Sequence, residues 1–365
     1  MTQVKDLIRT EIETSGPITV SRYMQLCLGH PEHGYYVKGD PLGREGDFTT
    51  APEISQLFGE LIGAWLVEAW RQLGRPTPCA LVELGPGRGT LMTDILRIVG
   101  LEPALCDALD VHLVETSPAL RIAQIKTLTT LGVTPTHLDS LESLPNVPTL
   151  WVANEFFDAL PANQWVRTQK GWNARKIGLD GNGDLVFGVD PTPLPAPKAI
   201  ADGPPGTIVE HSPAQDAVMQ QLASHARIHG GAGLIIDYGA LESGTGDTLQ
   251  AVRRHKTTDP LADPGETDLT THVDFEHLAQ IAQKNDVTNL GVAQQGAFLL
   301  ALGLLERAGQ LGAGSDPATQ DAISLAVERL AGDAAMGKLF KVMGFASAAI
   351  PLPGLEPITT LKEFA

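Results

Sequence analysis

The chain has 365 residues, and its 43 acidic side chains outnumber its 26 lysines and arginines, which gives a formal net charge of -17. A surface of this charge repels nucleic acid and anionic membranes and attracts basic partners. The length favours one large domain with an appended or inserted part, the 3 cysteines favour reduced thiols, and no apolar run is long enough to span a membrane.

The first 75 residues predict a helical cap. Apolar residues recur at helical spacing in two stretches, 4–12 and 54–69. We therefore expect a cap at 1–75 and a main domain at 76–365. Acidic residues near the N-terminus are unlike an acid-poor mitochondrial presequence. This favours a bacterial cytoplasmic protein, with a trimmed form in the mitochondrial matrix as the alternative.

A glycine-rich turn follows the next apolar run. That run ends at Leu84, predicts a buried strand and contains the acid Glu83. After it come glycines at alternate positions, Gly85, Gly87 and Gly89, and then a helical pattern. Because glycine permits positive φ and has no Cβ, the backbone amides of such a turn can approach a ligand closely. The turn therefore predicts a site for a nucleotide-like ligand.

The spacing of these glycines discriminates between nucleotide ligands. A dinucleotide fingerprint requires glycine where Thr90 stands, and a phosphate-binding loop requires a lysine, which is absent between Leu81 and Lys126. An acid followed by three alternate glycines instead places a carboxylate where it can face a cation, such as the α-amino group of S-adenosylmethionine. The segment favours S-adenosylmethionine as the cofactor, with a dinucleotide or a plain turn as alternatives.

Beyond this turn, apolar runs alternate with helical stretches, which predicts a doubly wound, parallel α/β sheet. Insertions interrupt this order at 163–206, which resembles hairpins and a proline-rich tether, and at 242–274, which we interpret as a lid over the ligand. The tail is helical over 296–330, and 340–345 predicts a closing edge strand. The apolar runs fall at 110–115, 133–138, 149–154, 207–210 and 232–238, and the helical stretches at 117–128 and 213–228.

Polar residues follow several of the predicted strands, where ligands bind in doubly wound sheets. Glu115 follows the second run and can accept hydrogen bonds from both ribose hydroxyls of the cofactor, or it can cap the next helix. Asp139 and Ser140 follow the third run and can contact the adenine amino group, or they form a simple turn.

The segment from Asn154 to Pro161 follows the fourth run and predicts the reaction loop. Its carboxylates cannot belong to a core strand, because an unpaired buried charge costs several kcal/mol. Methyl transfer to a guanidinium requires an in-line geometry and carboxylates that hold the cation. Glu155 is the first catalytic candidate, Asp158 the second, and Asn154 belongs to the same loop. A purely structural role for the loop is the alternative.

Three residues are candidates for contact with the methyl acceptor. Asp237 and Tyr238 pair an acid with an aromatic ring after the last clear run, and Phe156 lies in the reaction loop. No metal site is expected, because Cys27, His30 and other residues nearby do not supply a fourth ligand.

Several segments together resemble one protein family. They are 46–59, 82–90, 114–118, 154–161, 237–239 and 246–250. The combination resembles the MidA-like family, whose mitochondrial members are arginine methyltransferases needed to assemble respiratory complex I. The resemblance extends from about residue 15 to about residue 345.

This resemblance implies a Rossmann-like class I methyltransferase fold with a helical N-terminal cap and inserted hairpin and lid segments. It implies transfer from S-adenosylmethionine to an arginine on a protein; the alternatives are a small-molecule methyltransferase and an assembly factor that binds the cofactor without turnover. By resemblance, Asp47 and Thr50 close over the cofactor. The remaining cofactor-binding residues carried over by this resemblance are Glu83, Gly85, Gly87, Gly89 and Glu115, and Pro86 in the same turn is a further candidate.

Overall fold

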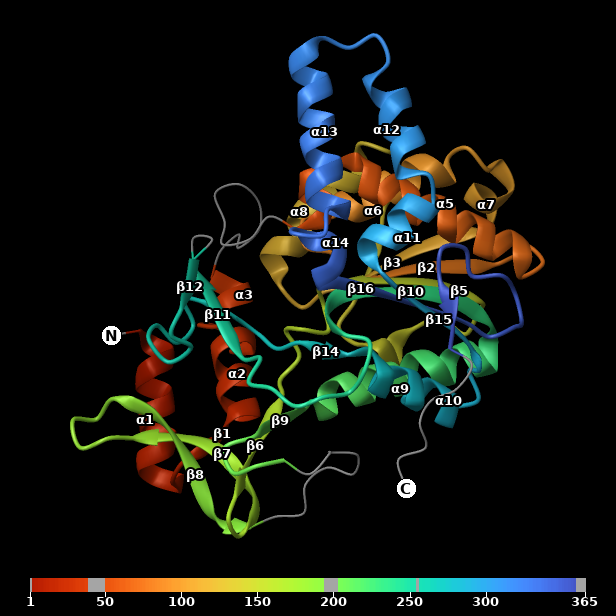
Figure 1. The fold of residues 1–365 in the computed structure, drawn as a ribbon. Coiled ribbons are helices and arrows are strands. Elements are labelled where there is room, and N and C mark those ends of the chain that lie inside the picture. The colour runs from red at the N-terminus through yellow and green to blue at the C-terminus, as the bar shows by residue number, and fades with distance from the viewer. Residues whose placement is uncertain (1, 39–49, 194–202, 254–255, 359–365) are drawn as a thin grey trace.

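The structure is a computed structural model that describes residues 2–38, 50–193, 203–253 and 256–358. Figure 1 shows a large body built on a central sheet and a smaller side body that contains the N-terminal helices. Within the described ranges, no helix combines the length and apolar character needed to cross a membrane.

The central sheet is mixed, with parallel strands from its middle to one edge and antiparallel strands at the other edge. Its strands lie in the order β17, β15, β16, β10, β5, β2, β3 and β4, and β14 pairs with the end of β10. The strands from β10 to β4 are parallel, whereas β16 is antiparallel to both β10 and β15. Their bounds are β2 Cys79–Leu84, β3 Leu109–Val114, β4 Thr136–Leu138, β5 Thr149–Asn154, β10 Gly231–Ala240, β14 Val273–Asp274, β15 Asn289–Gln294, β16 Phe340–Ala346 and β17 Glu356–Pro357.

Helices cover both faces of the central sheet (Figure 1). Helices α5, α6, α11, α12 and α13 contribute to the core on one face, and α9 and α10 to the core on the other. The helices are α1 Gln3–Ser15, α2 Val20–Gly29, α3 Tyr35–Lys38, α4 Ala51–Ile54, α5 Gln56–Gln72, α6 Thr90–Val99, α7 Pro103–Ala108, α8 Pro118–Thr129, α9 Pro213–His229, α10 Phe275–Lys284, α11 Gln295–Ala301, α12 Leu304–Gly312, α13 Pro317–Ala331 and α14 Met336–Leu339, with a short 3-10 turn at Leu141–Ser143.

Strand β2 illustrates why a continuous apolar run forms the middle of this sheet. All its residues are buried, with Leu81 in one core and Val82 in the other. A strand covered by helices on both sides has no polar face, so apolar residues occupy consecutive positions. This burial places the end of the strand, and the turn after it, at a fixed point on the sheet edge.

The side body combines parts of the chain that are distant in sequence. Helices α1 and α2 pack against an antiparallel sheet, in which β1, β7, β6 and β9 are neighbours and β8 pairs with β7. A smaller sheet of β12, β11 and β13 joins the same core. The bounds are β1 Ile18–Thr19, β6 Asn163–Thr168, β7 Gly171–Leu179, β8 Leu185–Pro193, β9 Ile208–His211, β11 Gln250–Arg253, β12 Lys256–Thr258 and β13 Asp268–Thr270.

The predicted α/β class is confirmed, and two strand positions are corrected. The run at 207–210 forms β9, which pairs with β6 in the side body and not with the central sheet. The run at 340–345 forms β16, which lies between β10 and β15 and is not an edge strand. An apolar run shows that a strand is buried, but it does not show which strand lies beside it.

The segments predicted as a cap and a lid have definite positions. Helix α5 packs on the central sheet, whereas α1 and α2 pack in the side body, so 1–75 contributes to both. The 242–274 segment, which lacks a clean period, contains β11, β12, β13 and β14. Its closure over a ligand stays a prediction.

Candidate active site

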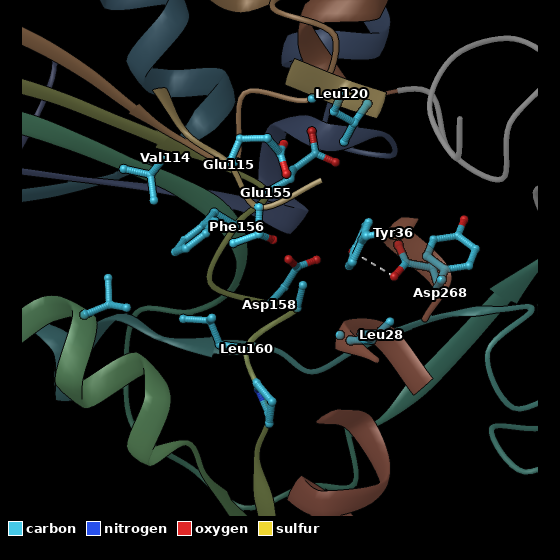
Figure 2. Close-up of a pocket in the computed structure, with 18 of the residues that line it drawn as sticks. Leu28, Tyr36, Val114, Glu115, Leu120, Glu155, Phe156, Asp158, Leu160 and Asp268 are labelled. Carbon is cyan, nitrogen blue, oxygen red and sulfur yellow. Dashed lines mark hydrogen bonds between the residues drawn. The ribbon is translucent and has the colours of Figure 1, made fainter. Parts of the chain in front are cut away.

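A cavity of about 470 Å³ lies where β2, β3 and β5 end against the side body (Figure 2). Leu28 and Tyr36 from the N-terminal helices and Asp268 from β13 form one side of it. Val114 and Phe156, from the ends of β3 and β5, lie on the opposite side. The site therefore forms only when the two bodies are packed together.

The glycine-rich turn adopts the conformation for which glycine is needed. Gly85, Gly87 and Gly89 have φ values of 64°, 53° and 83°. Gly85 and Gly87 line the cavity, and a Cβ on Gly85 would lie 2.8 Å from Cδ2 of Phe156. Gly89 is the N-cap of α6, and Pro86 is buried and does not line the cavity. The turn presents bare backbone to the cavity, as predicted.

Glu115 lines the cavity and is held by two hydrogen bonds. Its Oε1 accepts from the backbone N–H of Ser117 at 2.8 Å, and its Oε2 accepts from Nε2 of Gln124 at 3.3 Å. Burial raises the pKa of Glu115 above its ordinary value. Glu115 therefore keeps the turn before α8 in place, which was the alternative prediction, while it also faces the cavity.

Gln124 is a structural partner of this site that sequence reasoning missed. Its side chain is completely buried, and its Nε2 also donates to the carbonyl of Gly87 at 2.6 Å. Its Oε1 lies 2.8 Å from Nε2 of His137. Gln124 thus ties the glycine-rich turn to Glu115. A glutamine on the inner face of α8 has no sequence feature that distinguishes it from an ordinary helical residue.

Asp139 and Ser140 both line the cavity, as the adenine contact requires. Oδ1 of Asp139 accepts a hydrogen bond from Nη2 of Arg121 at 2.6 Å, which fixes the carboxylate at the rim. Leu120 and Leu141 supply apolar wall nearby. An apolar slot with a polar edge fits a flat heterocycle, and the adenine contact stays a prediction.

Glu83 occupies a different position from the other acids. It is 2 % exposed and does not line the cavity, and its Oε2 has no hydrogen-bond partner among the described residues. Burial raises the pKa of Glu83 to about 8, although the backbone N–H of Met92 opposes this effect. Because Glu83 does not line the cavity, its contact with the cofactor stays a prediction, and its unpartnered oxygen is the observation that keeps it open.

Glu155 begins the reaction loop in a strained backbone conformation. Its φ is 51°, a value that residues with a long side chain rarely adopt. Oε1 accepts from Nδ2 of Asn154 at 3.0 Å and from the backbone N–H of Ala51 at 3.2 Å. Burial raises the pKa of Glu155 to about 7. Strain of this kind persists where the surroundings enforce it, as at functional sites.

Asp158 and Tyr238 are neighbours at the cavity wall, and both residues line the cavity. Burial raises the pKa of Asp158 to about 7. Across the cavity, Tyr36 donates to Oδ1 of Asp268 at 2.9 Å (Figure 2). Asn154, by contrast, does not line this cavity; it acts on Glu155.

The predicted place of Asp237 in the acceptor channel is wrong. Asp237 has no exposed surface, and its Oδ2 accepts from the backbone N–H groups of Phe157 and Asp158, at 3.0 and 3.1 Å. Its Oδ1 accepts from the N–H of Tyr238 at 2.9 Å. Asp237 is a positioning residue that fixes the reaction loop. The sequence shows an acid at a strand end but not the direction of its side chain.

Two further residues were predicted to close over the cofactor. Thr50 lines the cavity, whereas Asp47 lies outside the described residues. The side body adds lining residues that sequence reasoning missed, because only the fold brings them to the sheet edge. These missed residues are Gln25, Leu28, Tyr35, Tyr36 and Asp268.

Comparisons with known proteins agree with this geometry. A profile for S-adenosyl-L-methionine-dependent methyltransferases matches residues 61–293. The chain belongs to the MidA-like family of these enzymes. It is 38% identical to "Protein arginine methyltransferase NDUFAF7 homolog, mitochondrial" of Drosophila melanogaster, over 92% of this chain and 83% of that protein. The "Protein arginine methyltransferase NDUFAF7, mitochondrial" of Homo sapiens is also 38% identical, over 80% of this chain and 72% of the human protein.

A solved structure is similar over nearly the whole chain. It is described as a likely methyl transferase from Burkholderia thailandensis, and it was solved with bound S-adenosyl-homocysteine. The two structures superpose with a TM-score of 0.81 and 27% identity, over 97% of this chain and 92% of the bacterial protein. The protein is therefore an S-adenosylmethionine-dependent methyltransferase. The bare backbone of Gly85 and Gly87, which we call the glycine cradle, and the Glu115 carboxylate line the cavity and are suited to that cofactor.

The first prediction concerns the glycine cradle. Gly87→Val places a branched side chain at φ 53°, where backbone meets ligand, and should raise the Kd for S-adenosylmethionine by about 100-fold or more. Isothermal titration calorimetry measures this Kd. Gly132→Val is the matched control, because Gly132 has a φ of 74° and does not line the cavity. Equal Kd values for both variants would show that Gly87 is not part of the cofactor site.

The second prediction concerns Asp237. Asp237→Asn replaces one acceptor oxygen by a donor that faces a backbone N–H, and should destabilise the fold by about 1–3 kcal/mol and slow methyl transfer. Urea denaturation and a transfer assay measure the two effects. Asp180→Asn is the control, because Asp180 also accepts two backbone N–H groups but in an exposed turn. Equal stability of the two variants would contradict this role.

Proposed function

We propose that this enzyme transfers a methyl group from S-adenosylmethionine to an arginine side chain of a protein. The observation that carries the proposal is the Glu155 carboxylate, which lines the same cavity as Gly85 and Glu115 and is held there by Asn154 and Ala51. The names of the relatives support the type of acceptor. A subunit of respiratory complex I is the acceptor that the family resemblance implies.

The reaction loop is suited to a guanidinium acceptor. Guanidinium is a planar cation with a pKa above about 12, and it binds carboxylates through its N–H groups. Glu155 binds and orients the group, and the Asp158 carboxylate takes the proton that the methylated nitrogen loses. The cofactor, when bound, supplies the activated methyl group on its sulfonium. A proton acceptor with a pKa near 7 is matched to neutral pH.

The direct test uses labelled S-adenosylmethionine and a lysate from a strain that lacks this protein. Mass spectrometry then locates the labelled residue. We expect label on arginine of one or a few proteins. Label on a small molecule would favour the small-molecule enzyme. Cofactor binding with no transfer at all would favour an assembly factor without turnover.

The third prediction concerns the charge of Glu155. Glu155→Gln keeps the shape of the side chain but removes its charge, so transfer should fall by about 100-fold or more while the Kd for S-adenosylmethionine changes little. In the wild type, kcat/KM should rise with pH through about 7 as the carboxylate ionises. Rate assays and calorimetry check both results. A collapse of cofactor affinity instead would place Glu155 in the cofactor site.

The fourth prediction follows from the same pKa. Folded Glu155 keeps its proton up to about pH 7, whereas the unfolded chain loses it near pH 4.5, so wild-type stability should fall as pH rises through this interval. Glu155→Gln lacks this effect and should be more stable by about 1–3 kcal/mol at pH 8, but equal at pH 4. Urea denaturation at several pH values measures the difference; a constant difference would contradict the raised pKa.

The cellular location stays a prediction. The curated relatives are named mitochondrial, so they do not support the cytoplasmic preference from the sequence. The similar solved structure comes from a bacterium. We therefore include both a bacterial cytoplasm and a mitochondrial matrix in the proposal, and fractionation of the source cell decides between them.

A further inference from the structure

A second cavity, of about 340 Å³, adjoins the cofactor cavity. Glu155 and Tyr238 line both cavities, which have no other lining residue in common. The rest of its wall comes from β11, from His272, from the start of β16 and from the segment of α13 and α14. These two side chains therefore form the partition between the two spaces.

The second cavity combines polar side chains at the partition with apolar side chains elsewhere in its wall. Glu155 forms part of the partition, and His272 lies beside it. The rings of Tyr238 and His272 meet edge to face, with their centroids 5.5 Å apart. Val252 and Leu339 supply apolar wall, and Leu339 is 48% exposed. A long side chain with an apolar stem and a cationic end has the complementary pattern.

The acid at the partition favours a cation at the inner end of this cavity. Glu155 is acidic, whereas burial and the nearby charge of Lys341 lower the pKa of His272, which keeps its imidazole neutral near pH 7. Lys341 does not line the cavity, and its ammonium donates to the carbonyls of Lys338 and Leu339. Arg329 is the cationic lining residue among those described, and it is exposed on α13, where solvent and salt screen its repulsion. Arginine carries its charge at the end of a flexible apolar stem, so it fits a space with apolar wall and an acid at the partition.

We propose that the second cavity is the entrance for the acceptor arginine, which is inserted between α14 and β11 until its guanidinium reaches Glu155. The inference rests on the proposed function and adds the direction of entry. The donor and the acceptor then approach the partition from opposite sides. An approach of this kind is what an in-line transfer requires, because the incoming nitrogen and the leaving sulfur must lie on opposite sides of the methyl carbon.

The position of the entrance suggests which part of the chain determines the specificity for the methyl acceptor. Arg329, Met336 and Leu339 lie C-terminal to residues 61–293, the segment matched by the methyltransferase profile. This C-terminal segment supplies half of the lining of the entrance and none of the lining of the cofactor cavity. Substitutions in the C-terminal segment can change acceptor binding without a change in the glycine-rich turn.

The turnover test uses labelled S-adenosylmethionine and the lysate described above. Ala335→Trp fills the cavity from its wall, and Leu339→Lys places a cation on the same wall; each should raise the apparent KM for the labelled protein by about 10-fold or more without change in cofactor Kd. Ala313→Trp, in the cavity between α12 and α13, and Leu325→Lys, exposed on α13, are the controls. Equal rates in all four variants would overturn the proposed entrance.

A second measurement separates this inference from the proposed function. An S-adenosyl compound in which the methyl is replaced by a propyl chain ending in guanidine should bind more tightly than S-adenosylhomocysteine, by about 10-fold or more. Ala335→Trp should remove this gain, and Ala313→Trp should keep it. This result supports the entrance even if no arginine is labelled. If arginine is labelled but the wild type shows no gain, or Ala335→Trp keeps the gain, the entrance lies elsewhere and the proposed function stands.

Discussion

Carboxylates buried without a matching cation are the constraint on which this site depends. Glu155 accepts hydrogen bonds from a backbone N–H and from an amide. In the described part of the chain, neither lysine nor arginine is among the main causes of the pKa shift of Glu83, Glu155 or Asp158. Burial raises the pKa of each, which shows that ionisation is disfavoured in the free protein. A cationic ligand would supply the missing charge, and both sulfonium and guanidinium are cations.

The fold satisfies this constraint with a rigid support. Asp237 is completely buried and accepts three backbone N–H groups from the reaction loop and from its own strand end. The side body then closes the cavity from the opposite side with Tyr36 and Asp268. Neither half of the wall is formed by one continuous segment, so the two bodies must be correctly packed before the site exists.

Much of the central site was predictable from the sequence, because local patterns encode it. Leu84 and the glycines after it predict a strand, a turn and a helix, and Glu115 and Glu155 follow predicted strands. The other side of the cavity depends on contacts between residues that are distant in sequence. Tyr36 and Asp268 are hydrogen-bonded although they lie more than 200 positions apart, and the hydrophobic periodicity of the sequence does not predict such a contact. The direction of Asp237 and the neighbours of β9 and β16 were missed for the same reason.

The left-handed backbone at Glu155 has an evolutionary consequence. A glycine at this position would relax the main chain and remove an acid whose ionisation is disfavoured, but it would leave the N–H of Ala51 and the amide of Asn154 without this acceptor. Backbone strain by itself therefore favours the loss of this glutamate. Its persistence in a lineage requires continued pressure from the chemistry itself, which makes position 155 a useful marker when active enzymes must be distinguished from relatives that have lost turnover.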